Sequence, residues 1–443
     1  MNDSQKNYMA RGARAAANYN SMQIMTAGET VLTWSIAGGA IAGVIFRPRQ
    51  WPEAVWASLG AVLVVACGLV STGAAAGAIE KGTDVYLFLT GMMLLAELAR
   101  REGVFDWLAT HAVQAAKGSR ARLFTLVYGV GILVTVFLSN DATAVVLTPA
   151  VYAAVKKARA DALTYLFICA FIANAASFVL PISNPANLVV YGKTLPPLIP
   201  WFRTFLLPSL VSIAATYAML RWVLRKEIRG EIDGGPAPSE LSREGKRAAW
   251  AIAGAGAALI AASALDLDLG LPTCAGALLA IVAATGLRGR AIRELAEGVS
   301  WSVLPLVAGL FVLVEAINRA GALAHMERLM QTFAAMPRIA GELFASFAIA
   351  ALANVMNNLP AGLLAGSAVQ TSHVASSIRD SVLIGVDLGP NLSVTGSLAT
   401  VLWLIALRRE GVEISGWRFL KVGLLVMPPA LFLATLAMSL LSP

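Results

Sequence analysis

The stretch FLSNDATAVVLTP, residues 137–149, places a Ser-Asn-Asp step in the middle of an apolar segment. Apolar residues extend back to Leu123 and forward to about position 155. Backbone groups left unpaired in hydrocarbon are costly, so a break at membrane depth survives only inside protein or beside water. We therefore interpret 123–138 and 142–155 as the two arms of a re-entrant hairpin with a polar tip.

The composition places this hairpin in a membrane protein. Of the 443 residues, 58% are hydrophobic and 14% are charged, whereas soluble domains are about one quarter charged. Apolar stretches long enough to cross a bilayer recur along the chain, for example 248–265 and 417–441. The short alternating segments of a membrane β-barrel are missing from the sequence. The predicted fold class is an all-α polytopic membrane protein whose partner is the lipid bilayer.

The net charge of +8 fits basic cytoplasmic loops better than nucleic-acid binding. No P-loop, dinucleotide fingerprint or zinc-ligand spacing occurs. Cys67, Cys169 and Cys274 are far apart in apolar segments and form no ligand cluster. We therefore expect no metal, no cofactor, no nucleic acid and no ATPase activity in this chain.

The two halves of the sequence resemble each other. LTGMMLLAELARREG (89–103) matches VAGLFVLVEAINRAG (307–321) at an offset of 218, with Gly91 opposite Gly309 and Glu97 opposite Glu315. The same order of elements follows in each half, ending in the breaks SNDATAVVLTP and MNNLPAGLLAG. These matches predict a polar tail over 1–24, a first transmembrane repeat over 25–223, a linker over 224–247 and a second repeat over 248–443.

A re-entrant hairpin leaves about five membrane crossings in each repeat. An odd number of crossings inverts the second repeat relative to the first. Placing the linker 224–247 in the cytoplasm also puts most lysine and arginine residues inside. Inverted repeats with broken helices are typical of secondary transporters.

A second broken helix is predicted in each half, within NAASFVLPISNPANLVV (174–190) and GVDLGPNLSVTGSLATVLW (385–403). Two hairpin tips and two broken helices can form one polar substrate site at mid-membrane. The alternative for each polar side chain is that it only ties helices together. The candidate substrate-binding residues are Ser139, Asn140, Ser183, Asn184, Asn187, Asn357, Asn358, Asn391, Ser393, Thr395 and Ser397.

Carboxylates at membrane depth are the candidates for coupling transport to protons. Asp141 and Asp387 adjoin the polar breaks and have no basic residue close in sequence. Glu97 and Glu315 are weaker candidates, because each has an arginine four residues later and could form a structural ion pair.

The stretches GVDLGPNLSVTGSLATVLW, SNDATAVVLTP and NNLPAGLL resemble those of the arsenite/antimonite efflux permeases, the arsenical pump membrane proteins of the ion transporter superfamily. The resemblance covers most of residues 28–441. It departs from the family pattern at Pro185, which leaves the geometry of the first broken helix open.

This resemblance implies a multi-pass protein of a bacterial or archaeal plasma membrane. It implies export of arsenite or antimonite from the cytoplasm in exchange for protons by alternating access. Some members of that family associate with a soluble arsenite-stimulated ATPase. The alternatives are a sodium/proton antiporter or a sodium- or proton-coupled dicarboxylate or citrate transporter of the same superfamily. An intramembrane enzyme would need a nucleophile–base pair or a metal cluster, and the sequence contains neither. A purely structural membrane protein would not need paired broken helices.

Overall fold

A computed structural model describes residues 25–233, 240–286 and 288–441. The predicted tail over 1–24 lies outside these residues. Within the described ranges the chain forms helices joined by short loops, with one isolated β-bridge between Ser119 and Glu231 and no strand. The prediction of an all-α protein is confirmed.

The helices of the first half run from residue 27 to residue 223. Their bounds are α2 (Ala27–Phe46), η1 (Pro48–Gln50), α3 (Glu53–Ala66), α4 (Thr72–Lys81), α5 (Thr83–Arg101), α6 (Val104–Ala115), α7 (Arg120–Phe137), α8 (Asn140–Ala142), η2 (Thr143–Leu147), α9 (Thr148–Lys157), α10 (Ala162–Ala175), η3 (Pro181–Ser183), α11 (Pro185–Tyr191), η4 (Gly192–Thr194) and α12 (Leu198–Val223).

The second half begins after the linker, at residue 243. Its helices are α13 (Arg243–Ala264), α14 (Gly270–Thr285), α15 (Gly289–Gly298), α16 (Val303–Arg319), α17 (Ala322–Ala334), α18 (Arg338–Met356), α19 (Asn358–Ser372), α20 (Ser376–Leu388), η5 (Gly389–Leu392), α21 (Leu398–Arg409) and α22 (Gly416–Leu441). The order of long, short and broken helices in the first half recurs here, from α2 and α13 through to α12 and α22.

The matched glycines of the two repeats make equivalent helix contacts. A Cβ atom on Gly91 of α5 would lie 2.6 Å from the backbone carbon of Thr273 in α14. A Cβ atom on Gly309 of α16 would lie 2.8 Å from the backbone carbon of Ala57 in α3. Each repeat therefore packs one helix against the other repeat through a glycine, because only a residue without a side chain allows the backbones to approach this closely.

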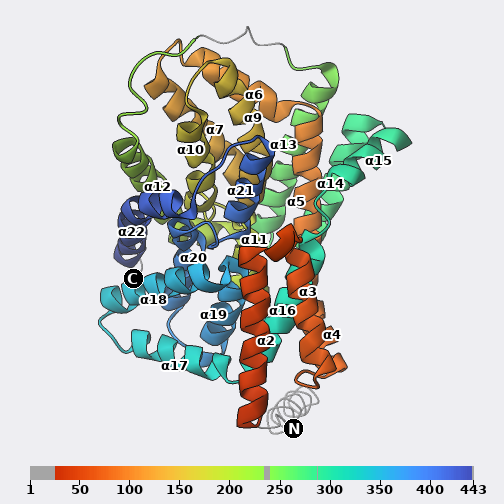
Figure 1. Ribbon diagram of the computed structural model, residues 1–443, viewed down its shortest axis with the longest axis vertical. Helices are drawn as coiled ribbons and strands as arrows, with labels where there is room; N and C mark the ends of the chain where they lie inside the picture. The colour runs from red at the N-terminus through yellow and green to blue at the C-terminus, as the bar shows by residue number, and fades with distance from the viewer. Residues whose placement is uncertain (1–24, 234–239, 287, 442–443) are drawn as a thin grey trace.

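Both predicted hairpins form, and the two arms of each end in the same region. Beside α7 and α9, Gly118 and Ala158 accept backbone hydrogen bonds from linker residues Ile232 and Asp233, at 2.8 and 3.1 Å. The arms of the second hairpin, α18 and α19, both contact α17. In Figure 1, α6 and the linker lie at the upper end, whereas α17, the counterpart of α6, lies near the lower end. The orientation of the repeats in a membrane stays a prediction.

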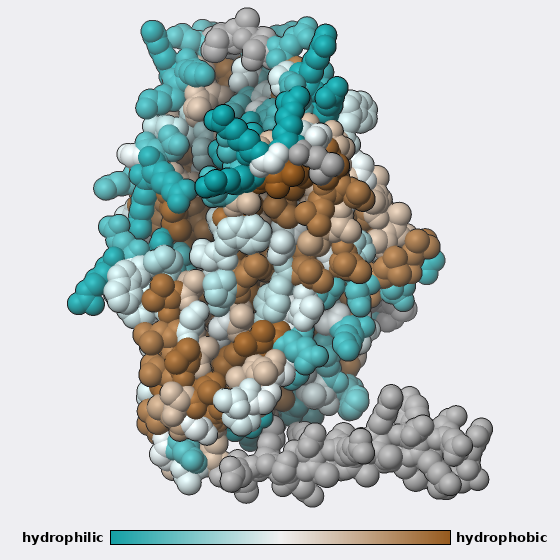
Figure 2. Space-filling view, turned by 90° about the vertical axis from the view of Figure 1, so that its right-hand side faces the viewer, coloured by the Kyte–Doolittle hydropathy of each residue, from teal (hydrophilic) through white to brown (hydrophobic). Residues whose placement is uncertain are grey.

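Six of the described helices are long and apolar enough to cross a membrane, or up to eight spans if each bent pair, α4 with α5 and α15 with α16, counts as one. Figure 2 shows hydrophilic side chains gathered at the upper end and many hydrophobic side chains over the face below. This distribution fits a multi-pass membrane protein, because apolar side chains can face lipid there.

The helix breaks have local chemical causes. In the first hairpin, η2 is a π-helical segment that ends two residues before Pro149, whose missing N–H removes one helical hydrogen bond. The Thr148 hydroxyl donates to the Thr143 carbonyl across this segment, at 3.2 Å. In the second hairpin, Asn357 has φ 77° and its side chain accepts from the Leu359 N–H at the start of α19. With ψ 153° this residue lies outside the compact left-handed helical region, in a backbone conformation that is strained for any residue with a side chain.

Candidate functional site

The two broken segments meet and are joined by a matched pair of hydrogen bonds. Asn184, the N-cap of α11, donates from Nδ2 to Oδ1 of Asp387 near the end of α20, at 2.8 Å. Ser397, the N-cap of α21, donates from Oγ to Oδ1 of Asn174 near the end of α10, at 3.2 Å. Asp387 follows Asn174 by 213 positions and Ser397 follows Asn184 by the same number. The two bonds are therefore counterparts across the repeats.

Asn391 lies inside this junction. Its Oδ1 accepts from Nδ2 of Asn174 and its Nδ2 donates to the Phe171 carbonyl, both at 3.0 Å. The side chain is fully buried, and a buried amide without such partners would be costly. Asn391 thus joins the two repeats in this conformation.

Other predicted polar residues satisfy the backbone of the breaks. Asn187 donates from Nδ2 to three carbonyls, those of Ser177, Leu180 and Pro181. Ser183 donates to the carbonyl of Val136 in α7, at 3.0 Å. In the other repeat, the Ser393 hydroxyl donates to Oδ1 of Asn354 at 2.6 Å, and the Thr395 hydroxyl donates to the backbone carbonyl of Asn354 at 3.1 Å. Val136 and Asn354 are counterparts at offset 218, so both breaks are fastened to the same turn of a hairpin arm.

The hairpin tips differ in their surroundings. Ser139 caps α8 by accepting from the Ala142 N–H, and Asn140 accepts from the Asp141 N–H, at 3.1 and 2.9 Å. In the second tip, Asn357 donates to the Thr395 carbonyl at 3.4 Å. Asn358, the counterpart of Asp141, is buried, and its Oδ1 has no hydrogen-bond partner among the described residues.

Asp141 lines a cavity of ≈ 60 Å³ between α5, the first hairpin tip and the junction of α15 with α16. Ser139 and Glu97 line it as well, and Pro185 at the start of α11 closes one side. The remaining lining is mostly apolar and includes Phe88, Leu89, Met92, Met93 and Val303. This lining contains two carboxylates and neither lysine nor arginine.

A larger cavity of ≈ 750 Å³ adjoins the small one and shares Glu97, Val145, Val146, Gly298, Ser300, Val303 and Leu402 with it. We call it the vestibule. Its outer lining includes Arg47, Glu53, Arg100, Asp106 and Arg409. The vestibule lies toward the linker, because Glu102, two positions after Arg100, contacts Gly245 at the start of α13. The vestibule therefore lies between the linker end and the small cavity at Asp141.

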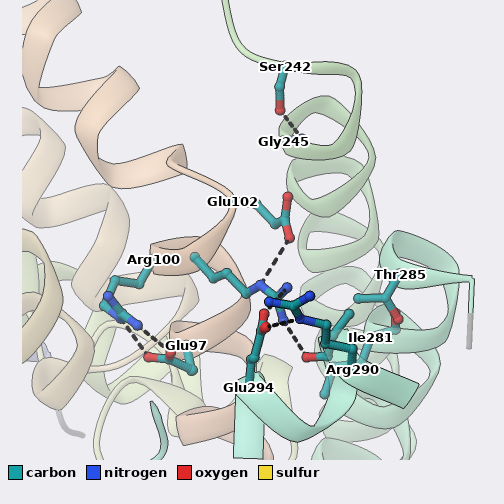
Figure 3. A network of polar contacts seen from close by, with 11 residues as sticks. Glu97, Arg100, Glu102, Ser242, Gly245, Ile281, Thr285, Arg290 and Glu294 are labelled. Carbon is teal, nitrogen blue, oxygen red and sulfur yellow. Dashed lines mark hydrogen bonds and ion pairs between the residues drawn. The ribbon is translucent and has the colours of Figure 1, made fainter. Parts of the chain in front are cut away.

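Glu97 forms an ion pair, but with a different arginine from the predicted one. Arg100, three residues later, donates from Nε and Nη2 to the two oxygens of Glu97, at 2.7 and 2.6 Å (Figure 3). Arg101, the predicted partner, instead pairs with Glu294 of α15 at 2.8 Å. Glu97 and Arg100 are three residues apart and therefore neighbours on the surface of α5. Arg101 is the next residue along the helix and points in a different direction, toward α15. For Glu315 the prediction is confirmed, since Arg319 lies 3.0 Å away.

The sequence-based interpretation missed several residues of the junction. Asn174, Thr400 and Asn354 were not among the candidates, although each bonds to one of them. The position of Asn174, 213 residues before Asp387, was the available signal. Among the described residues, no group of three or more His, Cys, Asp or Glu side chains could hold a metal ion.

Comparison with known proteins decides the family. Residues 41–385 match the family described as citrate transporter (CitMHS). The chain belongs to the citrate transporter family. Its membership makes the chain a membrane transporter, in agreement with the apolar helices and the broken segments.

Relatives of the chain include arsenical pump membrane proteins. The protein of that name from Escherichia coli K12 is 28% identical over 422 residues, which cover 90% of this chain and 95% of the relative. The one from Yersinia enterocolitica is 27% identical over 412 residues, covering 89% and 95%. The resemblance to this family is thus confirmed.

The fold has a solved counterpart in the YdaH transporter of Alcanivorax borkumensis, whose crystal structure was described as having an unusual topology. The two chains superpose with a TM-score of 0.52 at 13% sequence identity, covering 83% of this chain and 86% of the other. At this identity the likeness concerns the fold alone.

Proposed function

We propose that this transporter exports arsenite or antimonite from the cytoplasm in exchange for protons. The observation that carries the proposal is the lining of the cavity at Asp141, which offers carboxyl, hydroxyl and apolar groups but no basic side chain. Arsenite as a neutral trihydroxide can exchange hydrogen bonds with Ser139 and Asp141 without a fixed counter-charge. The relatives named arsenical pump membrane proteins favour the same substrate.

Proton exchange is the second part of the proposal. Asp141 faces the cavity, and Asp387 lies in the junction between the repeats, where no lysine or arginine of the described residues is hydrogen-bonded to it. An isolated charge at membrane depth is costly, so each carboxyl is suited to carry a proton through one half of the transport cycle. Glu97 is less suited, because Arg100 neutralises it.

Alternating access would use the same geometry. The vestibule lies toward the linker, and we expect the linker to be cytoplasmic from the distribution of lysine and arginine residues. The paired bonds of Asn184 with Asp387 and of Ser397 with Asn174 close the contact between the broken segments. We interpret the structure as a cytoplasm-facing state that loads substrate at Asp141.

A carboxylate such as citrate is the second candidate substrate. The family match and the arginines Arg47, Arg100 and Arg409 of the vestibule favour it. However, Arg47 and Arg100 are paired with Glu53 and Glu97. A polyanion would also have to approach the two carboxylates of the inner cavity without a base to offset them.

Everted membrane vesicles test the proposal. Arsenite should accumulate when the vesicle interior is acidic, without ATP, and a protonophore should abolish the accumulation. Citrate in excess should not compete. Citrate-driven or sodium-driven flux without arsenite movement would replace arsenite by the second candidate.

A further inference from the structure

Two buried aspartates of α20 are bonded to two residues of α11. Asp387 accepts from Asn184 and Asp380 accepts from the Tyr191 hydroxyl, at 2.8 and 2.5 Å. Asp380 and Asp387 are seven residues apart, and so are Asn184 and Tyr191. The earlier aspartate bonds to the later residue of the other set, so α11 runs antiparallel to α20. Two helical turns, about 10 Å, separate the two carboxyls on one face of α20.

A third acid lies beside Asp380. The helices α18 and α20 run in the same direction, because Gly385 contacts Ser346 and Gly389 contacts Ala350. Glu342, one turn before Ser346, is therefore level with Asp380 and Ser381. It is fully buried, and neither carboxylate oxygen has a hydrogen-bond partner in the described part of the chain.

Two arginines border these acids and lead to solvent. Arg379 Nε lies 3.8 Å from Asp380 Oδ1, and its guanidinium lies over the Tyr191 ring at 4.6 Å from the centroid. Arg338 Nε lies 3.8 Å from Glu342 Oε1. The side chains of Arg338, Arg379, Asp380 and Glu342 are 44, 24, 11 and 0% exposed. The acids thus lie behind two arginines that are partly exposed to solvent, and the arginines can balance their charge.

The matching positions of the first repeat carry no acids. The counterpart of Glu342 in the first repeat is Phe124, at offset 218, and the counterpart of Asp380 is Phe167, at offset 213. Both phenylalanines are buried core residues. Burying carboxyls where the other repeat packs aromatic rings is energetically unfavourable, which indicates a role other than packing.

The acids lie at the face remote from the vestibule. Lys193, two residues after Tyr191, lines a pocket with Asp84 and Asp268. Asp84 is at the start of α5, whose far end carries Arg100, and Asp268 follows the end of α13 that is remote from the linker. The vestibule opens at the linker end, so Asp380 and Glu342 face the opposite side.

We propose that Tyr191, Asp380 and Glu342 form a proton-uptake site that loads Asp387 from the face remote from the linker. The inference rests on the proposed proton exchange and names where the proton is taken up. A hydronium ion gives its proton to a carboxylate oxygen of Asp380 or Glu342 and leaves as water. That carboxyl then passes the proton through water to Oδ2 of Asp387, which has no hydrogen-bond partner among the described residues, and becomes a carboxylate again.

Leu383 and Ile384 lie between Asp380 and Asp387 on α20, and both are fully buried. Proton transfer therefore requires water to enter between α11 and α20. A site of this kind would separate proton uptake at one face from substrate loading at the other, as exchange across a membrane requires.

The test is a rapid pH jump on the purified protein in lipid nanodiscs, followed by infrared absorption of protonated carboxyls. The Asp387 band is the one missing from Asp387→Asn. We expect Asp380→Asn and Glu342→Gln to slow its appearance at least about tenfold, since a positioned proton carrier contributes that much or more. The final amplitude of the Asp387 band should equal that of the wild-type protein. The exposed Asp268→Asn, at the same face, is the matched control and should leave the rate unchanged.

Tyr191→Phe serves if the other variants do not fold, because the ring can keep its packing on Trp201 and Phe205 while the bond to Asp380 is lost. It should also slow the band. A wild-type rate in all three variants, or a wild-type protein without an Asp387 band, would overturn the proposal.

Flux in proteoliposomes separates this inference from the proposed function. Slowed Asp387 protonation in a protein that moves no arsenite would refute the substrate and retain the uptake site. Proton-driven arsenite flux with an unslowed Asp387 band in all three variants would retain the function and refute the uptake site.

Discussion

Asn184 and Asp387, which lie in different repeats, are joined by a 2.8 Å hydrogen bond while both are fully buried. The counterpart bond, from Ser397 to Asn174, has an amide where the first has a carboxyl. An amide suffices to hold the broken segments together at one of the two positions. The carboxyl at the other therefore adds a group that can gain and lose a proton without being required for the joint.

Asp387→Asn tests this separation of roles. Asparagine still offers an Oδ1 acceptor to Asn184, so we expect a folded, monodisperse protein. Proton-driven arsenite accumulation should fall to the level seen with a protonophore, while exchange of arsenite across the membrane continues. The comparison is Asp233→Asn, an exposed aspartate paired with Arg159, which should behave as wild type. Normal accumulation in Asp387→Asn would remove Asp387 from the coupling mechanism.

Asp141→Asn should impair a different step. Asp141 lines the cavity with Ser139, so its loss is expected to abolish proton-driven uptake and also to slow arsenite exchange. The measurement is exchange of labelled arsenite in proteoliposomes at equal pH on both sides. Asp268→Asn provides a control for removing one aspartate. Full coupling in Asp141→Asn would mean that its side chain is neither a proton carrier nor part of the substrate site.

The glycines at the repeat interface give a prediction on stability. A methyl group on Gly91 or Gly309 would fall within 2.6–2.8 Å of a neighbouring backbone. We expect Gly91→Ala and Gly309→Ala each to destabilise the protein by about 1–3 kcal/mol, the usual cost of overpacking. Gly129→Ala in α7, which has open space around it, should have no such cost. Stability is measured by thermal unfolding in detergent. An equal loss of stability in Gly129→Ala and Gly91→Ala would contradict the interpretation of these contacts.

Much of the fold could be predicted because repeats and membrane helices leave strong signals in sequence. Gly91 with Gly309 and Glu97 with Glu315 revealed the repeat, and SNDATAVVLTP revealed the first hairpin. The length of an apolar span and the position of a polar break are set by the lipid bilayer, which requires apolar side chains and paired backbone groups along the whole span. Such patterns do not require knowledge of which side chains meet.

The candidate site was predicted less completely because its contacts join distant positions. Asn174 looked like one amide in an apolar helix, yet it bonds to Asn391 and Ser397, more than two hundred residues later. For Glu97 the choice between Arg100 and Arg101 depended on where α15 lies. Asp380 and Glu342 gave no signal, because neither adjoins a polar break and only the packing of α11, α18 and α20 brings them near Tyr191.

Asn391→Ala distinguishes a joint from a substrate ligand. The variant removes the Asn391 side chain as a hydrogen-bond partner of the Phe171 carbonyl and of the Asn174 amide, so we expect a loss of about 1–3 kcal/mol in stability. Melting in detergent measures this loss. Asn318→Ala of α16 is the comparison, because the Oδ1 atom of Asn318 has no hydrogen-bond partner among the described residues. An unchanged melting temperature together with weaker arsenite affinity would instead place Asn391 in the substrate site.

Proton-driven export of arsenite is best tested by uptake into everted vesicles with an acidic interior and no ATP. We expect arsenite to accumulate and the accumulation to collapse when a protonophore is added. Citrate and sodium should not alter it, and Asp141→Asn should abolish it. Absence of arsenite movement, with citrate-dependent or sodium-dependent flux in its place, would contradict proton-driven export of arsenite.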